Sequence, residues 1–123
     1  MSLLLLKAYW ELIRFDIGVA RGGFDGLYSR IRNFPLNTNT GPGDVIGICS
    51  AVDTACIWYW KEVLCLERSA VTTRLLRQRG IAAKLVIGAQ QKPFRAHAWV
   101  EVGGRVVNDK PYVREMYAVL DHC

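Results

Sequence analysis

Apolar positions recur with the period of a helix over the first part of the chain. Between residues 3 and about 20, leucine, isoleucine, tyrosine and valine alternate with charged side chains, which predicts an amphipathic helix that Gly22 and Gly23 end. Residues 22–44 are rich in glycine, proline, asparagine and threonine. They predict a long irregular connection with at most one short helix around residues 27–32.

Two further helical patterns follow. Residues 45–61 are apolar almost all round, with Asp44 in the N-cap position, so we expect them to form the central buried helix, unless it breaks near Asp53. Residues 66–79 read as an amphipathic helix closed by Gly80. Its inward-facing residues are expected to be Leu66, Ala70, Leu75 and Leu76. Its outward-facing residues are expected to be Arg68, Arg74, Arg77 and Arg79.

After Gly80 the pattern changes to extended segments. Residues 82–89 and 96–102 predict strands joined by a loop, and 105–109 predict a returning strand after a two-glycine hairpin turn. Residues 113–123 are expected to form a final helix or a frayed tail. Helices followed by an antiparallel meander indicate an α+β domain.

Composition limits the function classes. The 123 residues suffice for one domain, and 51% hydrophobic residues exclude a disordered chain. The formal charge of +5 favours acidic partners, but the dispersed arginines and the lack of a basic run argue against nucleic acid. Four leucines before Lys7 are too few for a signal peptide or a membrane span. We therefore expect a cytoplasmic protein.

The four cysteines form no regular framework. Cys49, Cys56, Cys65 and Cys123 contain no CxxC pair, so thiols are expected in a reducing cytoplasm, and their spacing does not suit zinc. No metal or cofactor is expected. Cys49 and Cys56 lie on one face of an apolar helix and read as packing residues, and Cys123 as inert. Trp99 reads either as packing or as cleft lining.

Cys65 differs because it stands directly before a predicted helix. A thiol reacts as the thiolate, which the positive end of a helix dipole and a nearby histidine both favour. The chain offers His97, within a predicted strand, and His122, next to the last residue. We prefer His97, because a strand fixes its imidazole. The alternative interpretation of Cys65 is a small apolar residue buried in the core.

A histidine base also needs a third group to hold its ring. Asp109 ends the strand that is expected to pair with the His97 strand, and Asn108 precedes it. Adjacent residues of a strand point to opposite faces, so only one of the two can serve. The pattern alone leaves the choice open.

These residues resemble the transglutaminase-like fold of the papain-related superfamily. The blocks CLERS, LLRQRGI, PFRAHAWVE and VND are further similar to the C-terminal peptidase domain of lasso-peptide maturation proteins, over roughly residues 45–112. The resemblance implies a single transglutaminase-like domain over residues 1–123, in which a helix and loop over 1–44 precede the catalytic core over 45–112 and the tail over 113–123. It also decides for Asp109 as orienter, beside Cys65 as nucleophile and His97 as general base and acid.

The resemblance implies a cysteine peptidase that removes the leader from a ribosomally made precursor peptide. The implied partners are the precursor, a separate leader-recognition protein resembling a PQQ-biosynthesis chaperone, and an asparagine-synthetase-like ATP-dependent cyclase. The Cys65 backbone N–H would contribute to the oxyanion site, with a second donor not identified. Acyl transfer onto an amine, as in true transglutaminases, and a non-catalytic scaffold in the same pathway are the alternatives.

Overall fold

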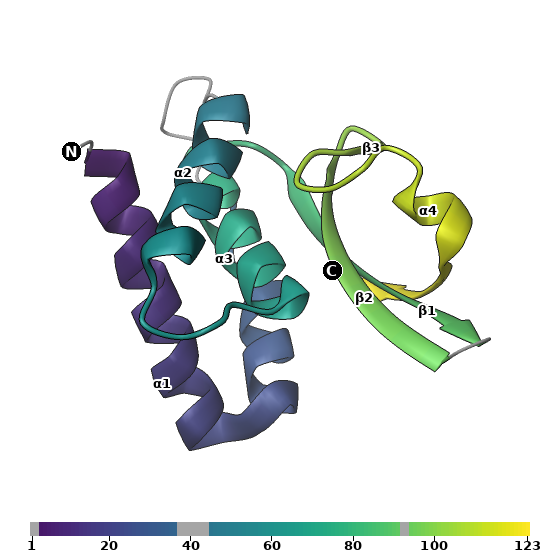
Figure 1. Cartoon of the computed structure of the whole chain (residues 1–123), viewed down its shortest axis with the longest axis horizontal. Coiled ribbons are helices and arrows are strands. Elements are labelled where there is room, and N and C mark those ends of the chain that lie inside the picture. The colour runs from purple at the N-terminus through teal and green to yellow at the C-terminus, as the bar shows by residue number, and fades with distance from the viewer. Residues whose placement is uncertain (1–2, 37–44, 92–93) are drawn as a thin grey trace.

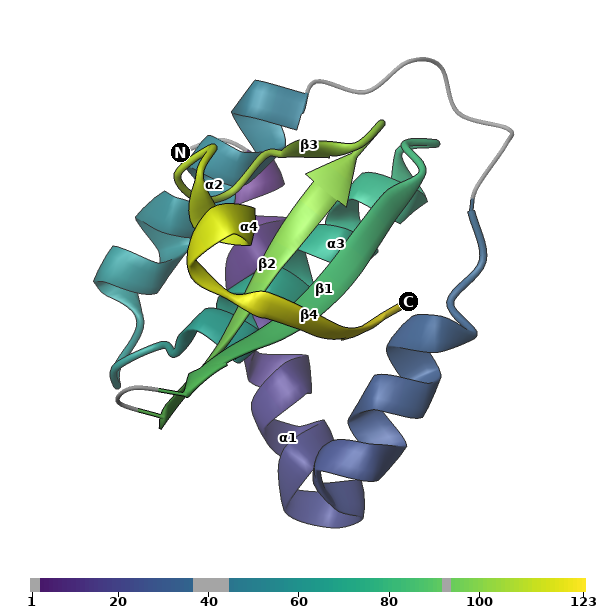
Figure 2. The ribbon, with the colours of Figure 1, turned by 90° about the vertical axis from the view of Figure 1, so that its right-hand side faces the viewer.

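A computed structural model describes residues 3–36, 45–91 and 94–123 of the chain. In these ranges helices α1 to α3 cover one face of an antiparallel sheet and the short helix α4 lies on the other face (Figures 1 and 2). The sheet order is β3-β2-β1-β4. The helices are α1 Leu3–Arg32, α2 Val45–Trp58, α3 Cys65–Gln78 and α4 Val113–Met116, and the strands are β1 Ala83–Gln91, β2 Phe94–Val102, β3 Arg105–Val106 and β4 Ala118–His122.

Helix α1 turns back on itself at Gly23, and Figure 2 shows its two arms. Gly23 has φ +68°, a conformation that glycine adopts without a side-chain clash. The predicted break is therefore correct, and the short helix predicted around residues 27–32 is part of the second arm. The helix resumes directly after Gly23 and continues to Arg32, so the irregular connection predicted from residue 22 was wrong. Burial of Ile31 against the sheet holds the second arm in place. Residues 37–44 of the predicted connection lie outside the described ranges.

The central helix is α3 and not α2. Helix α3 contacts α1, α2, β1 and β2, whereas α2 packs on α1 and α3. The apolar residues on the other side of α2 are exposed: Ile46 by 82%, Ile57 by 78% and Trp58 by 75%. The prediction of a central buried helix over 45–61 was wrong because α2 ends at Trp58 and has neighbours on one side, and the alternative break near Asp53 is absent.

Arg77 of α3 points inward, against the predicted outward face. It is buried, and its guanidinium donates to four backbone carbonyls from separate parts of the chain. These carbonyls belong to Ile31, Phe34 (3.4 Å), Ala83 (3.0 Å) and Cys123 (2.7 Å). Arginine carries five N–H donors in a fixed fork, so one side chain can serve several acceptors. Arg77 thereby joins the second arm of α1, the start of β1 and residue 123.

The sheet is more extensive than predicted, and its third strand is shorter. Strand β3 pairs with β2 only at Val106 and Arg105, so Asp109 lies beyond the strand that was expected to end there. The reason is local: the Asn108 side chain accepts the Val100 N–H at 2.8 Å, where a backbone carbonyl would otherwise continue the ladder.

Residues 113–123 form ordered structure and not a frayed tail. Val113 is buried on the outer face of the sheet with Val86 and Trp99. Strand β4 pairs with β1, and Cys123 exchanges two backbone hydrogen bonds with Leu85, of 2.9 and 3.0 Å. The buried apolar contact explains why this segment docks. Among the described residues, no helix has the length and hydropathy needed to cross a membrane.

Candidate active site

Cys65 is the first residue of α3. Leu64 before it is extended, with φ −81° and ψ 166°, and no side chain caps the helix. The first bond of the helix runs from the Arg68 N–H to the Leu64 carbonyl, at 3.0 Å. The N–H groups of the first turn before Arg68 therefore have no acceptor within the helix, and this end of its dipole is positive. The structure places the Cys65 thiol, which is partly buried, at that positive end.

His97 of β2 and Asp109 are in direct contact. His97 Nε2 lies 2.5 Å from Asp109 Oδ2, and the Lys110 N–H donates to Asp109 Oδ1 at 2.7 Å. Burial raises the pKa of Asp109, but the hydrogen bonds from His97 and Lys110 outweigh it, so the net pKa lies below its usual value. An ionised carboxylate only accepts, so Nε2 carries the proton and Nδ1 is the acceptor nitrogen of a neutral His97.

Cys65 and His97 line the same cavity. It has a volume of about 160 Å³, and its other lining residues are Leu66, Ile87, Ala96 and Ala98. In the part of the chain that the structure describes, no hydrogen bond joins the thiol to the imidazole, and such bonds often form only when substrate is bound. Cys65 and His97 line the recess, and Asp109 does not line it but contacts His97 Nε2. A thiol, an imidazole and a carboxylate are the groups that nucleophilic acyl chemistry requires.

Two aromatic rings hold His97 from the outer face of the sheet. Tyr117 stacks on the imidazole with ring centroids 5.1 Å apart and an interplanar angle of 25°, and the Trp99 ring centroid lies 6.0 Å away. Trp99 is fully buried and donates to Glu101 at 2.8 Å, so it is a packing residue. Tyr117 could not be predicted, because its segment has no clear period and reaches His97 only through the pairing of β4 with β1.

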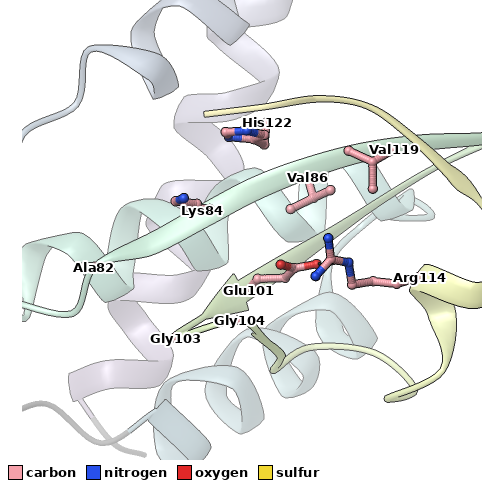
Figure 3. Close-up of a pocket in the computed structure, with 9 residues that line it drawn as sticks. All are labelled: Ala82, Lys84, Val86, Glu101, Gly103, Gly104, Arg114, Val119 and His122. Carbon is pink, nitrogen blue, oxygen red and sulfur yellow. Dashed lines mark ion pairs between the residues drawn. The ribbon is translucent and has the colours of Figure 1, made fainter.

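The alternative base and orienter lie elsewhere. His122 lines a second cavity, of about 480 Å³, together with Lys84, Glu101 and Arg114 (Figure 3). That cavity contains neither Cys65 nor His97. The Asn108 side chain is hydrogen-bonded to Val100 and Ser69, and among the described residues no hydrogen bond joins it to His97.

An acidic pair, the partly exposed Asp16 and the buried Glu67, lies near the start of α3 and was not predicted. Asp16 of α1 accepts hydrogen bonds from Tyr59 and from Lys61, the latter at 2.7 Å. Beside it, burial and the hydrogen bond and charge of Asp16 raise the pKa of Glu67 to about 7, while Lys61 acts in the opposite direction. The pair ties α1 to the segment between α2 and Cys65. Spacing in the sequence could not reveal it, because its members are far apart along the chain.

The remaining cysteines are free thiols that do not line this recess. Burial raises the pKa of Cys49 and of Cys56 to about 11, which agrees with packing roles. Within residues 3–36, 45–91 and 94–123, no three His, Cys, Asp or Glu side chains gather as a possible metal site.

The family described as the transglutaminase-like superfamily matches residues 10–121. The chain belongs to the transglutaminase-like superfamily. This confirms the expected family and its α+β fold. No solved structure matches the sequence significantly.

One curated relative carries a name that concerns peptide processing. The microcin J25-processing protein McjB of Escherichia coli is 48% identical over 56 residues, which are 46% of this chain and 27% of McjB. The similarity confirms the resemblance seen in the sequence blocks. The chain matches only about a quarter of the length of this relative.

Proposed function

We propose that this superfamily member is a cysteine peptidase that removes the leader from a lasso-peptide precursor. The observation that carries the proposal is the shared cavity of Cys65 at a helix N-terminus and His97 held by Asp109. The similarity to McjB, named for processing microcin J25, supports a peptide substrate. In this proposal a separate leader-recognition protein presents the precursor, and an ATP-dependent cyclase takes the product.

The proposed reaction begins at the Cys65 sulfur. The thiol proton passes to His97 Nδ1, and the thiolate attacks the carbonyl carbon of the last leader residue. The Cys65 backbone N–H, which has no acceptor within α3, stabilises the oxyanion. The C–N bond then breaks as His97 returns its proton to the leaving amine, and the leader remains as a thioester.

Water completes the cycle. His97 takes a proton from the water as its oxygen attacks the thioester, the C–S bond breaks, and Cys65 recovers a proton. The products are a leader with a free carboxylate and a core peptide with a free amine. Asp109 stays ionised, holds the imidazole in one tautomer and stabilises the imidazolium that forms in each half.

The test is cleavage of a precursor by purified protein together with its leader-recognition protein, followed by mass spectrometry. Cys65→Ala and His97→Ala are each expected to lower the rate by about a thousandfold or more. Cys56→Ala, the same chemical change at a packing cysteine, is the matched control and is expected to leave cleavage intact. Cleavage at the wild-type rate by Cys65→Ala would refute Cys65 as the nucleophile, and absence of cleavage by the wild type would favour the scaffold.

Added primary amine separates hydrolysis from acyl transfer. Because the chain belongs to the transglutaminase-like superfamily, an amine can compete with water for the thioester. We expect a leader with a free carboxylate as the main product. A leader carrying the amine as its main form would instead identify an acyl transferase.

A further inference from the structure

Beneath the Cys65, His97 and Asp109 site lies a chain of buried hydrogen bonds. Ser69 Oγ donates to the Ala98 carbonyl at 3.1 Å, and Asn108 Nδ2 donates to Ser69 Oγ at 2.9 Å. Asn108 Oδ1 in turn accepts the Val100 N–H at 2.8 Å. Ser69 is fully buried and Asn108 is 9% exposed. We call Ser69 and Asn108, with these bonds, the clasp.

Each protein segment joined by the clasp also carries a residue of the candidate site. Ser69 lies one helical turn after Cys65 on α3, Ala98 follows His97 on β2, and Asn108 immediately precedes Asp109. Residues one turn apart lie on the same face of a helix. The clasp therefore connects the three segments that must keep a fixed spacing for the chemistry.

We infer that Ser69 and Asn108 are positioning residues, which set the Cys65 helix against His97 and Asp109. The inference rests on the proposed function. Beside Ser69, α3 meets the sheet through apolar contacts among Ala70, Leu85 and Ala98, and the hydrogen bond from Arg77 to the Ala83 carbonyl lies two turns further along the helix. Apolar contact has no direction and lets a helix slide by fractions of an ångström, whereas a hydrogen bond fixes both distance and angle. The clasp supplies that directional constraint.

The clasp also replaces a missing strand. Strand β3 pairs with β2 only at Glu101 and Val102, so the neighbouring edge of β2 needs other partners for its backbone groups. The Val107 N–H donates to the Val100 carbonyl at 3.0 Å, and the clasp takes the Val100 N–H and the Ala98 carbonyl. If these bonds only supplied partners for the edge of β2, their loss would lower the stability of the protein and nothing else. A positioning role predicts in addition a change in the reactivity of the Cys65 thiol and in the rate of catalysis.

The test compares Ser69→Ala with Thr72→Val. Thr72 is a buried residue of the same helix whose hydroxyl donates within the helix, to Arg68 at 2.8 Å. Both variants lose a buried hydroxyl, but only Ser69→Ala breaks a link between segments. Asn108→Asp is the second clasp variant, because it keeps the acceptor for the Val100 N–H and loses the donor to Ser69. It allows the same test if Ser69→Ala does not fold.

The first readout is independent of peptide cleavage. The pH dependence of Cys65 alkylation by iodoacetamide is followed by mass spectrometry of the Cys65 peptide, with His97→Ala as reference. We expect Ser69→Ala and Asn108→Asp to shift the profile toward that of His97→Ala, and Thr72→Val to keep the wild-type profile. Clasp variants with the wild-type profile would overturn the inference.

The second readout is precursor cleavage below the unfolding temperature. We expect kcat to fall by about ten- to a hundredfold in the clasp variants with KM changed by less than about threefold, because misplaced reacting groups slow the chemical step. A loss of kcat no larger than that of Thr72→Val would also overturn the inference. If the alkylation profile shifts but the wild type does not cleave, the clasp stands and the proposed function fails.

Discussion

Gly88 of β1 is the position where one added methyl group should disturb the site most sharply. Gly88 lies opposite His97 in the sheet register. A Cβ there would lie 2.7 Å from the Trp99 ring and 2.9 Å from Tyr117 Cβ. Trp99 is fully buried, so its ring has no free space into which it can shift. Gly88→Ala should therefore displace the two rings that support His97.

The expected cost is about 1–3 kcal/mol, the usual range for an overpacked core, or roughly 3–12 °C in Tm for a domain of this size. Gly26→Ala is the matched control, because Gly26 is in the second arm of α1 and a Cβ there meets nothing within 4 Å. That change should stabilise the protein by about 0.5–1 kcal/mol. Thermal and urea unfolding measure both. An unchanged stability of Gly88→Ala would refute the close packing of β1, Trp99 and Tyr117.

Three further predictions concern other contacts. Tyr117→Leu should lower kcat by about two- to tenfold, which corresponds to the free energy of one aromatic stack on His97. Tyr117→Phe keeps the ring and should leave kcat unchanged, and steady-state cleavage rates distinguish the two variants. Glu67 keeps its proton in the fold up to about pH 7, against a reference value of 4.5, so its stabilising contribution is full below about pH 4.5 and is lost as the pH rises toward 7. The Tm of Glu67→Gln minus the Tm of the wild type should therefore be larger at pH 8 than at pH 5. The same Tm difference at both pH values would contradict the raised pKa of Glu67. Arg77→Leu should lose about 2–4 kcal/mol in urea unfolding, because it leaves buried carbonyls without a donor, and Arg77→Lys should recover part of it.

Local patterns were sufficient where a side chain meets its own neighbours along the chain. The glycines near residue 23 identified the turn of α1, and the change of period after Gly80 located β1 and β2. The same reasoning failed for α2 and for Arg77, because burial of a helix face depends on what packs against it. It also missed Tyr117, which is next to His97 only because β4 folds back beside β1.

The sequence alone was enough to recognise the family, to predict the order of the elements from α1 to β2, and to propose the three residues of the candidate site, but it did not predict β4. Those features depend on short blocks of residues and on periodicity, which are properties of the linear chain. Three features became visible only in the folded molecule: His97 Nε2 contacts Asp109, Asn108 bonds to Val100 and Ser69, and α3 is the central helix. Each of these depends on distances between segments far apart in the chain, and such distances follow from packing as a whole.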